Sequence, residues 1–339
     1  MGSAGPVVFQ LETGRTAVPS FISPKSSKKE DAPLRTAWCW KSNIVFNMKK
    51  LLASEVLPDL ETGIAAEIGA LRGRGVEPAL AVILAGDNPE SQAYVGRKRK
   101  MAEKLGLRSV ECNLPAGISQ RELEAEIHRL NGDPDIHGVL CQLPLPEHLD
   151  GNRIPELIDP LKDVDCFHPY NFGLLARGTP RFVPCTAAGI LALLAHYRIA
   201  LSGRQVVVIG RSNIVGRPLS LLLSQKGHDA TVTLCHSRTA DLPRIASRAH
   251  ILVAAIGSPE WVVPEMIAEG ATVIDVGVNR VEDPSRPRGY RLVGDVDFEA
   301  ASARASAITP VPGGVGPLTV VMLMRNTVLA ARLQSGHGA

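Results

Sequence analysis

The chain has 339 residues, of which 45% are hydrophobic, 21% charged and 4% aromatic, and its net charge is +3. This length gives room for two domains that each bury a core, and the small net charge argues against nucleic acid or an anionic membrane as a partner. No apolar run approaches the ~18 residues of a membrane span. Six scattered cysteines without C-x-x-C spacing and nine histidines without metal-ligand spacing predict a metal-free cytoplasmic protein that has no disulfide framework.

Residues 1–47 are rich in Pro, Ser, Lys and Thr and show no sustained hydrophobic period. We expect a disordered leader there. Its acidic residues are unusual for a transit peptide, and no apolar segment precedes a cleavage site of small residues, but organellar targeting stays open. Met48 looks like a natural first residue. A second interpretation is therefore that residues 1–47 are an artefact of a start placed too far upstream.

The next part of the chain alternates helices with apolar strands. Gly73 and Gly75 end the first helix, Gly106 ends the second, and Ser119 forms a capping box with Glu122 for the third. Repeated strand and helix steps predict a parallel sheet. We expect helices over 54–71, 90–105 and 119–130, and strands over 79–84, 109–114 and 137–142.

A segment expected to be irregular, 154–173, separates this part from a second series of strands and helices. Irregular polar segments between domains are where binding sites tend to be built. Residues 309–317 are rich in glycine and proline, so we expect them to line a pocket with backbone. We further expect a helix over 187–197, strands over 205–209, 231–235, 251–255 and 272–276, a charged loop over 280–290, and a last helix over 318–332 that folds back across the first domain.

The stretch 206–218 has the order strand, glycine turn and helix that binds a dinucleotide pyrophosphate. Its turn is incomplete, because Ser212 and Val215 stand where the second and third glycines of G-x-G-x-x-G are expected, leaving Gly210 and Gly216. The turn alone is therefore weak evidence, and we expect its helix to begin near residue 213.

The next strand ends in His-Ser-Arg-Thr at 236–239, where an NAD site usually has an acidic residue for the ribose 2′-hydroxyl. Ser237 and Arg238, with Arg211, instead suit the 2′-phosphate of NADP. A generic strand-helix-strand unit with surface arginines is the alternative interpretation. Gly257 and Val278 follow two further strands at the edge where the ligand should lie.

Five motifs follow one another from about residue 48 to the end of the chain. They are Tyr-Val-Gly-Arg-Lys at 94–98, Gln-Leu-Pro-Leu-Pro at 142–146, Lys-Asp-Val-Asp at 162–165, Gly-Arg-Ser-Asn-Ile-Val-Gly-Arg-Pro at 210–218 and Pro-Val-Pro-Gly-Gly-Val-Gly-Pro-Leu-Thr at 310–319. In this order they resemble the methylenetetrahydrofolate dehydrogenase/methenyltetrahydrofolate cyclohydrolase family, and five ordered motifs are far more specific than one glycine turn.

The resemblance implies an α/β fold of two domains with the folate in the cleft between them, and a homodimer. A three-layer α/β catalytic domain would comprise 48–184 plus 317–335. A Rossmann-like, doubly wound parallel-sheet domain for NADP would comprise 185–316. The partners implied are tetrahydrofolate derivatives.

Carried over residue by residue, the resemblance makes Lys98 the catalytic lysine and Tyr94 its neighbour over the folate. Gln142 would be the amide beside the lysine, and Asp165 the carboxylate that anchors the pterin. A lysine desolvated in a cleft has a lowered pKa and can exchange protons near neutrality. Taken alone, each of these residues has an ordinary structural interpretation, such as a solvated helix lysine for Lys98.

The resemblance also implies the binding residues. Those for the substrate are Tyr94, Gln142, Leu143, Pro144, Asp165, Pro310, Gly313 and Gly314. Those for the cofactor are Gly210, Arg211, Ser212, Ile214, Val215, Gly216, Ser237, Arg238, Gly257, Val278 and Thr319. Two departures are that Cys166 stands where the family usually has glycine, beside Asp165, and that Thr186 lacks the usual following proline.

Three functions follow from these observations. The first is a bifunctional enzyme that oxidises methylenetetrahydrofolate with NADP and then hydrolyses the methenyl product to formyltetrahydrofolate, with Lys98 as general acid/base. The second is another NADP-dependent oxidoreductase that acts on a small acid, and the third is a nucleotide-binding regulatory or scaffold protein. Tyr94, Lys98, Gln142 and Asp165 favour the first, because they lie outside the predicted nucleotide domain.

Overall fold

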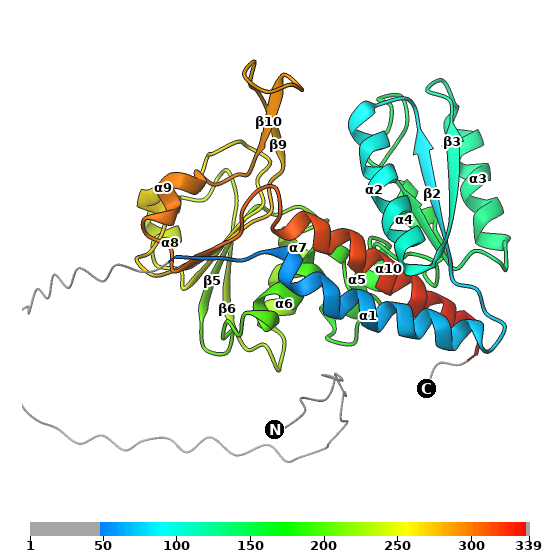
Figure 1. Cartoon of the computed structure of the whole chain (residues 1–339), viewed down its shortest axis with the longest axis horizontal. Helices are drawn as coiled ribbons and strands as arrows, with labels where there is room; N and C mark the ends of the chain where they lie inside the picture. Colours follow the sequence, from blue (N-terminus) through cyan, green and yellow to red (C-terminus); the bar gives the residue numbers. More distant parts are fainter. Residues whose placement is uncertain (1–47, 337–339) are drawn as a thin grey trace, which may run out of the picture. The chain divides into compact units, whose positions relative to one another are not determined.

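Two parallel sheets organise residues 48–336, which the computed structural model describes (Figure 1). The leader predicted over 1–47 lies outside these residues. The smaller sheet has the order β3-β2-β4 and the larger the order β1-β11-β8-β7-β5-β6, and every pairing in them is parallel. The predicted α/β fold with two parallel-sheet domains is confirmed, whereas the exact domain boundaries stay a prediction.

The bounds of the elements are close to those expected. The strands are β1 (Lys49–Lys50), β2 (Ala79–Ala85), β3 (Arg108–Leu114), β4 (Gly138–Cys141), β5 (Gln205–Ile209), β6 (Thr231–Cys235), β7 (Ile251–Ala254), β8 (Thr272–Asp275), β9 (Asn279–Glu282), β10 (Tyr290–Val293) and β11 (Ala307–Ile308). The helices are α1 (Ala53–Arg72), α2 (Pro89–Leu105), α3 (Gln120–Gly132), α4 (Ile154–Leu157), α5 (Pro169–Ala176), α6 (Cys185–His196), α7 (Gly216–Ser224), α8 (Leu242–Ala246), α9 (Phe298–Ser302) and α10 (Val315–Gln334), with a 3-10 turn at Pro264–Met266.

The continuous apolar run of β2 is explained by cover on both faces of the smaller sheet. All seven residues of β2 are buried. Successive side chains of a strand point to opposite faces. Leu80, Val82 and Leu84 accordingly belong to the core that includes α2 and α10, whereas Ala81 and Ile83 pack in the cluster that includes α3.

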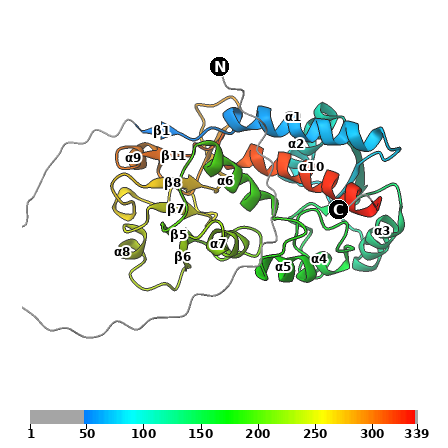
Figure 2. The same ribbon diagram turned by 90° about the horizontal axis from the view of Figure 1, so that it is seen from below.

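The larger sheet is also covered on both faces. Figure 2 shows its six strands in the order given above. Val206 and Val208 of β5 join the same core cluster as α6, α7 and α10, while Val207 and Ile209 join a second cluster with α8 and α9. Burial on both faces is the arrangement of a doubly wound sheet.

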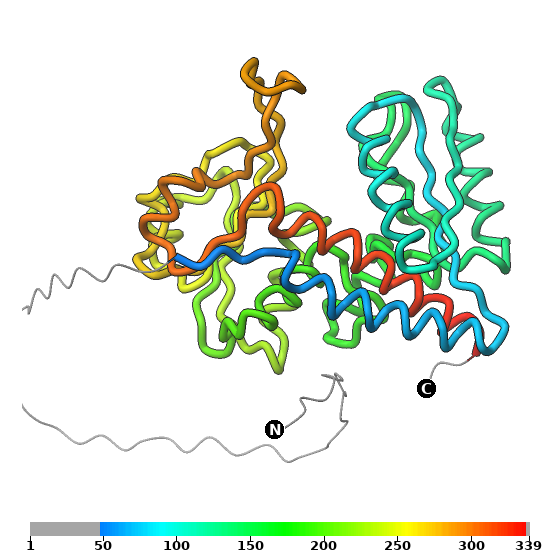
Figure 3. The backbone as a smooth tube through the Cα atoms, viewed as in Figure 1, coloured from blue at the N-terminus to red at the C-terminus, as the bar shows by residue number. Residues whose placement is uncertain are grey.

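The last helix connects the two regions. α10 contacts α1 and α6, and it also contacts α2, β2 and β4 of the smaller sheet (Figure 3). It therefore folds back across the first domain as predicted, although it begins at Val315 rather than 318. Its buried Asn326 donates from Nδ2 to the carbonyl oxygens of Val164 (2.7 Å) and Val183 (2.9 Å). These bonds fix one residue inside the segment 154–173 and one residue after it to the helix.

Three expectations about local structure were wrong. Residues 280–290 are not simply a charged loop, because β9 and β10 pair antiparallel there, with the Arg280 guanidinium 3.8 Å from the ring centroid of Tyr290. The segment 154–173 contains α4 and the start of α5. The helix after the glycine turn begins at Gly216 rather than near 213, because the turn continues through the preceding residues.

Within residues 48–336, none of the helices has the combination of length and apolar character that a membrane span requires.

Asn326→Leu should lower the free energy of unfolding by about 2 kcal/mol, because the side chain keeps its volume but leaves two carbonyl oxygens without their amide donor. Urea denaturation measures this. Arg325→Gln is the matched control, since Arg325 is the exposed neighbour on the same helix. A loss equal to that of the control would contradict the role given to these bonds.

Candidate active site

Lys98 is held against Gln142 by two elements of the smaller domain. α2 begins at Pro89 because the side chain of Asn88 accepts the N–H groups of Glu90 (2.9 Å) and Ser91 (3.1 Å). The ammonium of Lys98, in the third turn of this helix, donates to Oε1 of Gln142 at 2.8 Å. These two side chains, 44 residues apart in the chain, therefore meet as the resemblance implies.

The amide of Gln142 is oriented at both ends. Gln142 follows β4, and its backbone N–H donates to the carbonyl oxygen of Ile83 at 2.9 Å. Its Nε2 donates to the carbonyl oxygen of Leu143 at 2.6 Å. Because the amide nitrogen is bonded to the carbonyl of Leu143, the amide oxygen faces Lys98 and accepts its hydrogen bond without adding a charge.

Burial pushes both ionisable groups of the site toward their neutral forms. Desolvation lowers the pKa of Lys98, and the charge of Asp165 opposes this shift. Desolvation likewise raises the pKa of Asp165, opposed by the charge of Lys98 and by a hydrogen bond from the thiol of Cys185. A lysine with such a lowered pKa can act as a proton acceptor nearer to neutral pH than a solvated one.

In the Lys-Asp-Val-Asp motif, the first two residues stabilise the loop and the last one belongs to the site. Lys162 donates from Nζ to the carbonyl oxygens of Leu130 (2.9 Å) and Asp133 (2.7 Å). The buried carboxylate of Asp163 accepts the N–H groups of Phe167 (3.0 Å) and His168 (2.9 Å) and the amide of Asn171 (2.8 Å). With its neighbours committed to the loop, Asp165 is the member of the motif left to interact with Lys98.

Cys166 adopts a backbone conformation that favours glycine. Its φ is +63°, in the left-handed region that side chains rarely occupy. Its side chain is fully buried, and Sγ donates to the carbonyl oxygen of Phe182 at 3.2 Å. The extra side chain at this departure from the family pattern thus points into the core.

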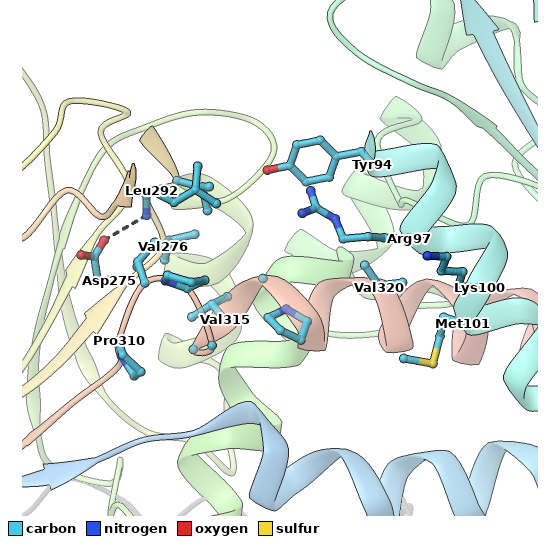
Figure 4. Close-up of a pocket in the computed structure, with 18 of the residues that line it drawn as sticks. Tyr94, Arg97, Lys100, Met101, Asp275, Val276, Leu292, Pro310, Val315 and Val320 are labelled. Atoms are coloured by element: carbon cyan, nitrogen blue, oxygen red, sulfur yellow. Dashed lines mark hydrogen bonds between the residues drawn. The ribbon is translucent and has the colours of Figure 1, made fainter. Parts of the chain in front are cut away.

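A cavity of about 350 Å³ lies next to Tyr94. Tyr94 and Arg97 reach into it from α2, and Val276 and Leu292 lie opposite (Figure 4). The Arg97 guanidinium lies 4.1 Å from the ring centroid of Tyr94. As predicted, residues 310–317, which include Pro310, Gly313 and Gly314, line a wall of this cavity.

The predicted folate residues are not all gathered around this cavity. Leu143 and Asp165 line a second, much smaller cavity of about 30 Å³, together with Cys141 and Phe167. Lys98, Gln142 and Pro144 line neither of the two. The structure thus brings Lys98 and Gln142 together by a hydrogen bond, and brings Tyr94 together with the 310–317 wall.

The predicted cofactor residues, Thr319 excepted, follow the carboxyl ends of four adjacent strands. Gly210–Gly216 follow β5, Ser237 and Arg238 follow β6, Gly257 follows β7 and Val278 follows β8. From β5 the chain goes to β6 on one side and then to β7 on the other, so the strand order reverses at this point. In open α/β sheets, ligands bind outside the carboxyl ends of the strands at such a switch point.

The two glycines that the turn retains are required by backbone contacts. A Cβ on Gly210, whose φ is +117°, would lie 2.0 Å from the carbonyl oxygen of Ala255. A Cβ on Gly216 would lie 1.9 Å from the carbonyl oxygen of Gly210. Ser212, in place of the second glycine, accepts the N–H of Val215 through Oγ at 3.1 Å and so supports the turn. The backbone of this turn is therefore closely packed, and side chains are excluded at both glycines.

Arg211, Ser237 and Arg238 are exposed near this turn. None of the three side chains has a hydrogen bond or an ion pair within residues 48–336. Thr319 does not follow a strand but lies in the first turn and a half of α10, where its hydroxyl donates to that of Thr186 at 3.3 Å.

Comparison with known proteins shows the same two parts. The catalytic domain of tetrahydrofolate dehydrogenase/cyclohydrolase matches residues 51–165, and the NAD(P)-binding domain of the same family matches residues 184–335. The chain belongs to this family. Bifunctional FolD 1 of Myxococcus xanthus is 50% identical over 285 residues, covering 84% of this chain and 98% of that protein. Bifunctional FolD 2 of Geobacter sulfurreducens is 49% identical over 289 residues, covering 85% of this chain and 97% of that protein.

Solved structures of the family have the same fold. The bifunctional FolD enzyme of Campylobacter jejuni is 44% identical, with a TM-score of 0.79, and the match covers 84% of this chain and 99% of that one. The FolD of Trypanosoma brucei, solved in complex with NADP and an inhibitor, is 42% identical, with a TM-score of 0.79 and coverage of 85% and 98%.

Sequence reasoning missed two buried aspartates beside the cofactor residues. Asp275 ends β8 and is 2% exposed, and Asp295 follows β10 and is 0% exposed. Burial raises the pKa of Asp275 to about 7, against backbone N–H donors that lower it. An acidic residue at the end of the apolar strand Thr-Val-Ile-Asp was the available signal for Asp275, whereas nothing local marks Asp295.

Metal ligands do not gather in the part of the chain from 48 to 336, where no group of three or more His, Cys, Asp or Glu side chains could hold an ion. Three of the histidines have structural roles instead. His137, His168 and His236 each accept a backbone N–H through Nδ1, from Ala79, Tyr170 and Arg238 respectively.

Proposed function

We propose that this chain oxidises methylenetetrahydrofolate with NADP and then hydrolyses the methenyl product to formyltetrahydrofolate. The bifunctional relatives, about half identical over most of their length, and the NADP complex of the Trypanosoma brucei enzyme support both activities. The observation that carries the hydrolytic half is the 2.8 Å hydrogen bond between Lys98 and the neutral amide of Gln142, in a site where burial lowers the pKa of the lysine.

Lys98 is the proton carrier in the proposed hydrolysis. Water adds to the methenyl carbon and loses a proton to the neutral amine of Lys98. The bond from this carbon to the ring nitrogen then breaks as that nitrogen takes the proton back from the lysine, and the remaining hydroxyl proton leaves to solvent as the formyl C=O forms. Since the methenyl substrate is a cation and the formyl product is neutral, one proton is released overall.

Gln142 and Asp165 set the protonation of the lysine in this proposal. An amide accepts a hydrogen bond from Lys98 without a charge, whereas a carboxylate in its place would hold the lysine protonated. Asp165 raises the pKa of Lys98, so the lysine keeps enough basicity to take a proton. The same carboxylate is proposed to anchor the pterin.

The strand ends of the larger sheet are the proposed NADP site. NADP, when bound, accepts the hydride that leaves the methylene carbon. The tight turn at Gly210 and Gly216 is open to a pyrophosphate, and the exposed Arg211, Ser237 and Arg238 are free to bind a 2′-phosphate. The cavity beside Tyr94 would hold the folate against the nicotinamide, so that hydride transfer depends mainly on positioning.

A homodimer and a cytoplasmic location complete the proposal. The homodimer rests on the family resemblance, and sedimentation at working concentration should give a mass near twice that of the chain. Only monomer would contradict it. The cytoplasmic location is supported by the free thiols of Cys112, Cys141, Cys166, Cys185 and Cys235, which suit a reducing compartment.

Lys98→Met should reduce cyclohydrolase turnover by roughly 10²- to 10⁴-fold, the range for a lost acid–base group, with a smaller loss of dehydrogenase turnover. Gln142→Met should also impair hydrolysis. In the unsubstituted enzyme the hydrolysis rate should rise with pH as Lys98 becomes neutral, and burial should place this rise below the pH at which a solvated lysine titrates. The variant should lack the rise.

Separate assays of the two steps over a pH series measure these effects. Lys226→Met is the matched control, because Lys226 is exposed and lines neither cavity beside the proposed site. Hydrolysis that survives Lys98→Met unchanged would rule out the proton-carrier role and leave the loop around Asp165 as the place to seek the base.

Arg211→Ala should weaken NADP binding by about 10- to 100-fold, because charge-assisted hydrogen bonds to a phosphate are worth about 1.5–3 kcal/mol, and should leave NAD binding almost unchanged. Calorimetric titration of both nucleotides tests this. Arg204→Ala is the control, since Arg204 is exposed just before β5, at the opposite end of the strand. Equal losses for both nucleotides, or a preference for NAD in the unsubstituted chain, would overturn the assignment.

A further inference from the structure

A buried carboxylate ties together the loops after two strands of the proposed NADP site. Oδ2 of Asp295 accepts the N–H groups of Ile256 (2.6 Å) and Gly257 (3.0 Å), and Oδ1 accepts the N–H of Ser258 at 3.0 Å. Oδ1 also accepts Nδ2 of Asn279 at 2.9 Å. One side chain thus binds three consecutive N–H groups after β7 and the residue that begins β9.

A second aspartate holds the first in place. Oδ1 of Asp275 accepts the backbone N–H groups of Gly277 (3.0 Å), the bond drawn in Figure 4, and of Asp295 (2.9 Å), while its Oδ2 accepts the N–H of Val296 at 3.0 Å. The N–H of Asp275 donates to Oγ1 of Thr309 at 2.7 Å. The hydrogen bonds therefore run without a break from the end of β11 through β8 to the loop after β7.

The backbone around the two carboxylates leaves no room for rearrangement. A Cβ on Gly277 would lie 2.1 Å from Oδ1 of Asp295, and a Cβ on Gly294 would lie 1.7 Å from Oδ2 of Asp275. Both carboxylates are buried among the loops that they bind. The arrangement is therefore a rigid support rather than a pair of surface caps.

The position of this support matches one half of the dinucleotide. In the proposed site, Arg238 after β6 would hold the 2′-phosphate, and the turn at Gly210 after β5 would hold the pyrophosphate. Since the sheet order continues with β7 and β8, the two loops that Asp295 joins would hold the nicotinamide half. Val276, Gly277 and Val278 after β8 also line the cavity that contains Tyr94.

The bonds to Asp295 also affect where a phosphate can bind. Three successive backbone N–H groups after a strand form a favourable anion site when they are free. Here the N–H groups of 256–258 are all turned to Asp295. A phosphate is left with the turn after β5, and the loop after β7 is left to contact the part of the cofactor that carries no phosphate.

We infer that Asp295, supported by Asp275, is a positioning residue that fixes the loops after β7 and β8 for the nicotinamide half of NADP. This inference rests on the proposed function. It predicts an effect confined to cofactor binding and hydride transfer, because hydrolysis of the methenyl substrate needs no nicotinamide.

Asp295→Asn should raise the dissociation constant of NADP and its KM by about 10- to 100-fold, because an amide presents N–H groups to donors that need an acceptor. Cyclohydrolase turnover, assayed on methenyltetrahydrofolate without nucleotide, should change by less than about 3-fold, within the range of surface effects. Asn279→Leu removes only one donor to Asp295, so it should raise the dissociation constant and the KM of NADP by a smaller factor. This second variant tests the inference if Asp295→Asn does not fold.

Asp297→Asn is the matched control. Asp297 lies two residues further on, and its side chain caps α9 by accepting the N–H of Ala300 at 3.2 Å, whereas only its backbone N–H bonds to the segment after β7, at Val262. This variant should keep the cap and leave NADP binding unchanged, because the amide oxygen of asparagine accepts the same N–H. If Asp295→Asn and Asn279→Leu bind NADP like the unsubstituted enzyme, or lose hydrolysis in proportion to NADP binding, the positioning role is wrong. Lack of both activities in the unsubstituted chain would instead refute the proposed function.

Discussion

The carboxyl ends of adjacent parallel strands necessarily meet at one edge of a sheet, and the larger domain depends on this constraint. The chain supplies a glycine turn after β5, a serine and an arginine after β6, and glycine-containing loops after β7 and β8. Because crossover connections put these segments side by side, residues far apart in the chain form a single binding edge. The same geometry brings Asp275 and Asp295 within hydrogen-bond distance of the loops they support.

Burial of a charged side chain has different consequences in the two domains. Around Lys98 it lowers the pKa of a cation, and the neutral amide of Gln142 allows that shift to persist. Around Asp295, four hydrogen-bond donors offset the unfavourable free energy of burying the carboxylate. The same hydrogen bonds hold the loops in one conformation. The first arrangement favours proton exchange, and the second favours rigidity.

Backbone conformation explains where side chains are tolerated near these sites. At Gly210 and Gly216 a Cβ would lie 2.0 Å and 1.9 Å from a carbonyl oxygen, so no side chain fits there. Cys166 occupies a left-handed conformation, and its side chain is accommodated because Sγ finds the carbonyl oxygen of Phe182 in the core. Only glycine fits at positions 210 and 216, whereas position 166 accepts a side chain.

The sequence by itself determined the fold class, the positions of most helices and strands, and the family, because apolar periodicity, caps and glycine turns are local signals and the five motifs are contiguous. It also pointed to Lys98, Gln142 and the edge after β5. Only the tertiary structure decided that β9 and β10 pair, that the predicted folate residues are not gathered around one cavity, and that Asp295 holds residues 256–258. The hairpin of β9 and β10 is local, but its charged and proline-containing connection hides the strand pattern. The other two features depend on contacts between segments that are distant in the chain, and such contacts are set by how the crossovers place strand ends, which leaves no periodic trace in the sequence.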